Sequence, residues 1–109
     1  MELAEFLIFQ CSSNFQSVHN EMDFKNKVVI ITGASSGIGR GAAEFLSSLG
    51  ARVVITGRSE NGLKETASKC KPNTFIIVAD VTKQEDRVKI IDETIKKFGK
   101  IDVLVNNAG

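Results

Sequence analysis

A glycine-rich turn between a buried strand and a helix constrains this chain more than any other feature. The turn is TGASSGIG at residues 32–39, and it directly follows the β-branched run Val28–Ile31. Apolar side chains at helical spacing come after it. Glycine spacing alone would be a weak signal, but strand, glycine turn and helix in this order indicate a nucleotide-binding site.

The three glycines of this turn have different expected roles. Gly33 lets the chain leave the strand in a tight turn, Gly37 lets the backbone approach a pyrophosphate, and Gly39 lets the helix pack closely on the strand. The first N–H groups of the helix, with the hydroxyls of Ser35 and Ser36, would donate hydrogen bonds to the phosphates. An ordinary strand–helix turn is the alternative, whereas a P-loop is excluded because no Lys-Ser or Lys-Thr pair closes the motif.

Strand and helix patterns alternate along most of the chain. The sequence predicts strands at 28–32, 52–56, 74–79 and 103–105, with helices from the glycine turn to about Leu49, from 59 to 69, and from about 82 to Gly99. Right-handed crossovers then give an α/β fold, the first half of a Rossmann-type doubly wound parallel sheet with strand order 3-2-1-4. We therefore assign residues 24–109 to an incomplete dinucleotide-binding domain.

Two of the helices carry specific expectations. The spacing of Thr82 and Glu85 predicts a capping box at the start of the third helix. The buried stripe of the first helix is predicted at Ile38, Ala42, Phe45, Leu46 and Leu49, and that of the third helix at Val88, Ile91, Ile95 and Phe98.

Residues 1–23 differ from the rest of the chain. Their apolar run, residues 3–9, is short and acidic at its start, and no Lys or Arg precedes Lys25, so neither a signal peptide nor a transit peptide is expected. A flexible tail is the preferred interpretation. The alternatives are a weak membrane or partner anchor through Phe6, Leu7 and Phe9, and a translation start at Met22.

The composition excludes several classes of protein. The 109 residues carry a formal net charge of +1, so no basic excess points to nucleic acid. An apolar stretch long enough to span a membrane is absent. Cys11 and Cys70 have no metal-like or redox spacing, so we expect a cytoplasmic protein.

The glycine turn and the last four residues together resemble a known family. The pattern TGxxxGxG at 32–39 and the segment NNAG at 106–109 are similar to the two cofactor-binding signatures of the short-chain dehydrogenase/reductase family, and the resemblance covers 24–109. It implies a nicotinamide-dependent oxidoreductase that transfers a hydride to or from a carbonyl or secondary alcohol of a small molecule. It also implies that the full-length protein is a homo-oligomer.

The end of the second predicted strand bears on the choice of cofactor. NAD sites commonly place Asp or Glu there, about 20 residues past the glycines, but this chain has Gly57 followed by Arg58. A guanidinium can bind the 2′-phosphate of NADP, which a carboxylate would repel. The sequence therefore predicts NADP rather than NAD, with a solvated loop residue as the alternative for Arg58. Arg40 is a second candidate, although we expect it on the solvent side of its helix.

Residues at two further strand ends are implied by the resemblance. Asp80 would hold the adenine amino group and the backbone of Val81 would contact the ring, while a helix-entry carboxylate beside Thr82 is the alternative for Asp80. In the last segment Asn107 is expected at the cofactor and Asn106 in a structural role. The complete predicted cofactor-binding set is Gly33, Ser35, Ser36, Gly37, Ile38, Gly39, Arg58, Asp80, Val81, Asn107, Ala108 and Gly109.

The catalytic residues of the family have no counterpart in this chain. Its Tyr-x-x-x-Lys pair cannot be present because the sequence contains no tyrosine, and the catalytic Ser lies past the second signature. We therefore expect an N-terminal fragment that is inactive alone, poorly stable, and left with an unpaired edge at strand 103–105. The alternatives are a non-catalytic dinucleotide-binding module or regulatory short isoform, an interaction protein that uses its tail and open edge, and, more weakly, a methyltransferase.

Overall fold

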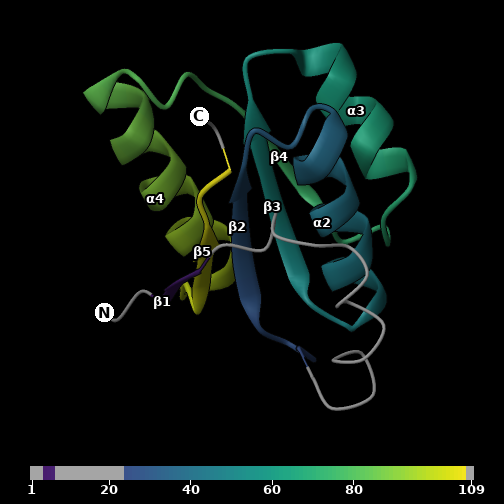
Figure 1. Cartoon of the computed structure of the whole chain (residues 1–109). Coiled ribbons are helices and arrows are strands. Elements are labelled where there is room, and N and C mark those ends of the chain that lie inside the picture. The colour runs from purple at the N-terminus through teal and green to yellow at the C-terminus, as the bar shows by residue number, and fades with distance from the viewer. Residues whose placement is uncertain (1–3, 7–23, 108–109) are drawn as a thin grey trace.

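The computed structural model describes residues 4–6 and 24–107. The chain alternates strands and helices (Figure 1). Its elements are β1 (Ala4–Phe6), β2 (Val28–Thr32), α2 (Gly37–Ser48), β3 (Arg52–Gly57), α3 (Glu60–Ser68), β4 (Phe75–Val78), α4 (Gln84–Phe98) and β5 (Val103–Val105).

The strands form one parallel sheet in the order β1-β5-β2-β3-β4. Strand β2 lies inside it, with Ile30 opposite Val54 of β3 on one side and Leu104 of β5 on the other. The predicted order 3-2-1-4 corresponds to β4-β3-β2-β5 and is thus confirmed. The strand order reverses at β2, because β3 and β4 are added on one side of it and β5 on the other.

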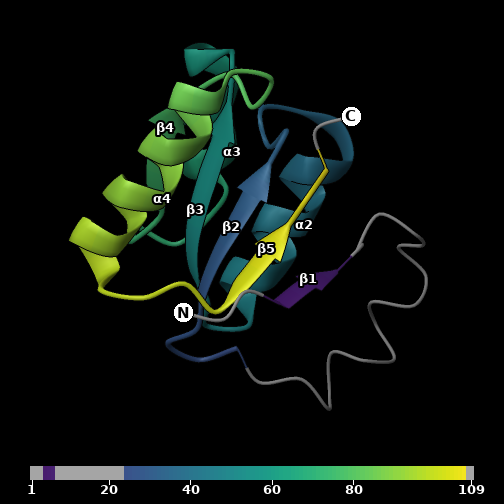
Figure 2. The same cartoon turned by 90° about the vertical axis from the view of Figure 1, so that its left-hand side faces the viewer.

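The outer edge of β5 differs from the prediction. We expected its backbone groups to be unpaired, but β1 pairs in parallel with β5, Ala4 opposite Val103 and Phe6 opposite Val105 (Figure 2). The flexible tail expected for residues 1–23 stays a prediction. An edge strand presents a row of free N–H and C=O groups, and a short apolar segment can satisfy them. The possible anchor residues Leu7 and Phe9 and the alternative start at Met22 lie outside the described residues.

Helices cover both faces of the sheet. Helices α2 and α3 lie on one face and α4 on the other (Figures 1 and 2). Val29, Ile31, Val53 and Ile55 pack beneath α2 and α3, whereas Val28, Ile30, Val54 and Ile77 pack beneath α4. Strands buried on both faces need apolar residues at successive positions, which explains the unbroken Val/Ile runs.

Two predicted buried stripes are partly wrong. Ile38 is 58% exposed at the start of α2, although Ala42 and Leu46 of the same stripe are buried. In α4 the buried positions are Ile90 and Thr94, and Val88 is 51% exposed. Helical spacing identifies an apolar side of a helix, but the neighbouring elements decide which part of that side is covered.

The predicted capping box is also wrong. Helix α4 begins one residue later than the box requires, with Lys83 as N-cap and no side-chain cap hydrogen bond. Asp80 Oδ1 instead accepts hydrogen bonds from the N–H and hydroxyl of Thr82. At the other end, Gly99 ends the helix in the left-handed region as predicted (φ 82°).

Asp102 joins β2 to the loop before β5. Its Oδ2 accepts a hydrogen bond from the N–H of fully buried Val28 at 2.8 Å, and its own N–H donates to the Val28 carbonyl at 2.9 Å. The bond from Val28 is the main cause that lowers the pKa of Asp102, with Lys100 contributing. A lowered pKa means that this stabilisation is present above the unfolded-state pKa and is lost as the pH falls through the folded value.

We predict that Asp102→Ala lowers the free energy of unfolding by about 1–3 kcal/mol at pH 7, because the buried Val28 N–H loses its partner. The difference from wild type should shrink as the pH falls below about 3.9, the ordinary pKa of an aspartate, toward the lowered pKa of Asp102 in the folded protein. Urea denaturation at pH 7 and at pH 3 measures the two differences. Asp92→Ala, at an exposed carboxylate of α4, is the control. An equal loss at pH 7 and pH 3 would contradict the account.

Helix α2 approaches the end of β2 at Gly39. A Cβ atom on Gly39 would lie 2.1 Å from the carbonyl O of Gly33 and 2.8 Å from Asn107 Nδ2. A Cβ on Gly41, two residues further along the same helix, would have no atom within 4 Å. The two glycines therefore provide a matched pair.

We predict that Gly39→Ala lowers the midpoint of thermal unfolding, since backbone must shift to relieve the contact, at a cost of about 1–3 kcal/mol or more. Gly41→Ala should leave the midpoint unchanged or raise it, because alanine is the better helix former. Circular dichroism melts of both variants test the close approach. Similar midpoints for the two variants would refute it.

Candidate functional site

The carboxyl ends of β2, β3 and β4 border one cavity at the upper edge of the sheet in Figure 1. Parallel strands end at the same edge, so residues distant in sequence meet there. The cavity has a volume of about 460 Å³. It is lined by Gly33, Ser35, Ser36, Gly57, Arg58, Ser59, Ala79, Asp80, Val81, Thr82 and Asn107.

The glycine turn exposes backbone donors at this cavity. Gly33 and Gly37 have φ values of 64° and 58°, which favour glycine. Within the described part of the chain, the N–H groups of Ser35 and Ser36 have no hydrogen-bond partner. Ser36 is the N-cap of α2 but makes no side-chain cap bond, so the free donors of the helix's first turn add to the set.

Space for a ligand also exists beside the turn. A Cβ on Gly37 would meet nothing within 4 Å. Ile38, a predicted contact residue, is exposed next to it. Free N–H groups, a helix N-terminus and no acidic residue in its first turn form an arrangement suited to an anion.

Arg58 brings a positive charge to the same cavity. It follows Gly57 at the end of β3 and its side chain is exposed, with no hydrogen bond or ion pair to any described residue. Its charge contributes to a lowered pKa of Asp80, although the hydrogen bonds from Thr82 are the larger cause. Arg58 and Asp80, which were predicted separately as cofactor-binding residues, thus line the same cavity.

Asp80 binds Thr82 at the entry to α4, which was the alternative structural role expected for it. Its Oδ1 accepts from the Thr82 N–H at 3.0 Å and from the Thr82 hydroxyl at 2.7 Å. Its own N–H donates to Asp86 Oδ2 at 2.7 Å. Asp80 and Val81 both line the cavity, while the adenine contact stays a prediction.

The asparagines after β5 connect that strand to β2. The Asn107 N–H donates to Thr32 Oγ1 at 2.9 Å, and Asn107 Nδ2 donates to the Gly33 carbonyl at 3.3 Å. Asn106 Oδ1 lies 3.4 Å from the Thr32 hydroxyl. Both asparagines thus have structural bonds, and Asn107 also borders the cavity. Ala108 and Gly109 lie outside the described residues.

We expected Arg40 on the solvent side of its helix, and this expectation is wrong. Its guanidinium reaches across to α3 and the turn, and its side chain is only 20% exposed. Sequence reasoning also missed two of its α3 partners, Gly62 and Thr66. Their separation of more than 20 residues from Arg40 leaves no local signal in the sequence.

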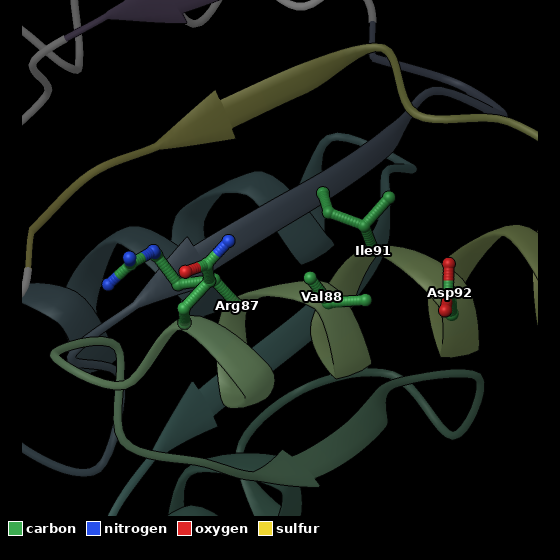
Figure 3. Close-up of a pocket in the computed structure, with 5 residues that line it drawn as sticks. Arg87, Val88, Ile91 and Asp92 are labelled. Carbon is green, nitrogen blue, oxygen red and sulfur yellow. The ribbon is translucent and has the colours of Figure 1, made fainter.

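A second cavity, of about 360 Å³, lies along α4. It is lined by Gln84, Arg87, Val88, Ile91 and Asp92, and all of them come from this one helix (Figure 3). The lining holds no nucleophile–base pair, so it offers no catalytic arrangement.

The described residues contain neither a metal-binding cluster nor a membrane-spanning helix. No group of His, Cys, Asp or Glu side chains in residues 4–6 and 24–107 could hold a metal ion. In the same ranges, every helix is too short or too polar to cross a membrane.

Comparison with known proteins places this geometry in a family. The family model for short chain dehydrogenases matches residues 27–109. An uncharacterized oxidoreductase of Staphylococcus saprophyticus is 44% identical over 92 residues, covering 81% of this chain and 39% of the relative.

Solved structures share the fold. Apo glucose dehydrogenase of Caenorhabditis elegans superposes with a TM-score of 0.77 and 45% identity, over 81% of this chain and 40% of that protein. The 3-ketoacyl-(acyl-carrier-protein) reductase of Brucella melitensis, complexed with NADH, gives a TM-score of 0.76 at 39% identity, over 80% and 36%. The chain thus spans about two fifths or less of the length of these relatives. With a family model that matches from the first long strand to the last residue, the chain belongs to the short chain dehydrogenase family.

Proposed function

We propose that this chain forms the cofactor-binding part of an NADP-dependent oxidoreductase. The observation that carries the proposal is one cavity that combines the free N–H groups of the glycine turn with the unpaired guanidinium of Arg58. Nicotinamide would supply or accept the hydride. The residues of this chain would bind and orient the dinucleotide.

The phosphates divide between two parts of the cavity. The pyrophosphate fits the N-terminus of α2, where Ser35 and Ser36 offer free N–H groups and Gly37 leaves open space. The 2′-phosphate of NADP fits Arg58, because β3 ends in Gly57 and no carboxylate stands there to repel it. Asp80 has its Oδ1 engaged by Thr82, which leaves Oδ2 for the adenine amino group.

Family membership does not choose the cofactor, since the Brucella reductase was solved with NADH. The preference for NADP rests on Arg58. The substrate class we propose is a small molecule with a carbonyl or secondary alcohol, which the glucose dehydrogenase and ketoacyl reductase among the relatives support. A cytoplasmic location and a homo-oligomeric full-length protein stay predictions.

Catalysis would require residues beyond this chain. The sequence has no tyrosine, and tyrosine is the expected proton donor or acceptor for the hydride transfer. We propose that the 109-residue chain alone binds cofactor without turning over substrate.

We predict that Arg58→Ala weakens NADPH binding by about 10- to 100-fold, because charge-assisted hydrogen bonds to the 2′-phosphate are lost. NADH binding should change by less than about twofold. Titrations followed by nicotinamide fluorescence measure both affinities. Lys64→Ala removes an exposed charge from α3 and is the control. Unchanged NADPH affinity in Arg58→Ala would show that this arginine does not select the cofactor.

A further inference from the structure

We propose that Arg40 is a positioning residue for the cofactor turn. It holds the carbonyl of Ser35 away from the cavity, so that the N–H groups of the turn face the pyrophosphate. The inference rests on the proposed dinucleotide binding and adds a residue that does not itself line the cavity.

Arg40 connects the glycine turn to α3 through all three nitrogens of its guanidinium. Nη2 donates to the Ser35 carbonyl at 2.5 Å and to the Gly62 carbonyl at 3.2 Å. Nε donates to Thr66 Oγ1 at 2.8 Å, and Nη1 to Glu65 Oε1 at 2.8 Å. The planar fork of an arginine can meet such a set of acceptors at once, which a lysine ammonium cannot.

Thr66 extends the same network to the neighbouring peptide. It is fully buried, and its hydroxyl lies 2.7 Å from the Ala34 carbonyl and 3.1 Å from the Gly62 carbonyl. A hydroxyl has one proton to donate, and the shorter distance assigns it to Ala34. The carbonyls of Ala34 and Ser35 are therefore both held on the α3 side.

The direction of these carbonyls fixes the direction of the donors. A trans peptide is planar, and its C=O and N–H point in opposite directions; none of the described peptide bonds is cis. With the Ala34 and Ser35 carbonyls bound on the α3 side, the N–H groups of Ser35 and Ser36 turn the other way. Neither of those N–H groups has a partner in the described residues, and both residues line the cavity.

Gly62 of α3 leaves the space that the Ser35 carbonyl occupies beside α3. A Cβ on Gly62 would lie 2.7 Å from the Ser35 carbonyl O and 2.9 Å from Ser35 Cβ. Any side chain there would push the turn off the acceptor position that Arg40 uses. This explains a glycine inside α3, where it otherwise costs helix stability.

A direct contact between Arg40 and phosphate is the competing explanation. The guanidinium is engaged by four residues, and one of them, Glu65, neutralises its charge. Arg40 is also absent from the cavity lining. A role through the turn predicts an effect on the pyrophosphate, which NADP and NAD share, whereas Arg58 should affect NADP alone.

The experiment titrates the 109-residue chain and its variants with NADPH and with NADH. Arg40→Met should weaken both by about 5- to 20-fold, which corresponds to one or so lost hydrogen bonds to a charged group. Arg40→Lys should recover little, because charge without the fork does not hold the turn. Gly62→Ala, which moves the same carbonyl sterically, should weaken both cofactors equally as well.

Glu65→Gln and Gly41→Ala are the controls, since the first keeps the bonds of Arg40 to the turn and the second adds a Cβ into open space. Full recovery by Arg40→Lys, or a loss restricted to NADPH, would overturn the proposal in favour of a direct charge contact. Wild-type affinity in Gly62→Ala would overturn it even if Arg40→Met does not fold. Failure of the unmodified chain to bind either cofactor would instead overturn the proposed function, and this inference with it.

Discussion

The backbone of one turn, residues 33–36, is the feature on which the site depends. It is held from three sides: Ala34 N–H donates to the Thr56 carbonyl of β3, Asn107 donates to the Gly33 carbonyl from the end of β5, and Arg40 and Thr66 bind the next two carbonyls from the helices. The carbonyls of Ala34 and Ser35 are thereby held on the α3 side. Ala34 anchors the turn in the core, and these hydrogen bonds determine which of its backbone groups a ligand meets.

The parallel sheet explains how the remaining groups reach that turn. In-register pairing of Thr32 with Thr56, and of Gly57 with Val78, brings three strand ends to one edge. Arg58 directly follows β3 and Asp80 comes two residues after β4, so no long loop is needed to bring them to one cavity. Packing on both faces keeps the strands rigid beneath them. The strand register thus determines the positions of Arg58 and Asp80.

The sequence allowed accurate prediction of features that depend on local patterns, and it failed for features set by distant partners. β-Branched runs, the glycine turn and the Gly99 stop located every long strand and all of the described helices. Ile38 and Val88 were misplaced because periodicity does not reveal which neighbour covers a helix side. Arg40 was misassigned because three of its four acceptor residues lie more than 20 residues away on α3. The pairing of Ala4 with Val103 joins opposite ends of the chain, and no local signal predicts it.

The central claim is that the N–H groups of the glycine turn receive the phosphates of a dinucleotide. An ¹H–¹⁵N correlation spectrum of the chain, recorded during a titration with NADPH, tests it residue by residue. The account predicts that the largest shifts occur at the amides of Ser35, Ser36 and Gly37, with a second group at Arg58 and Val81. Shifts confined to α4, or no saturable shifts at the turn, would contradict it.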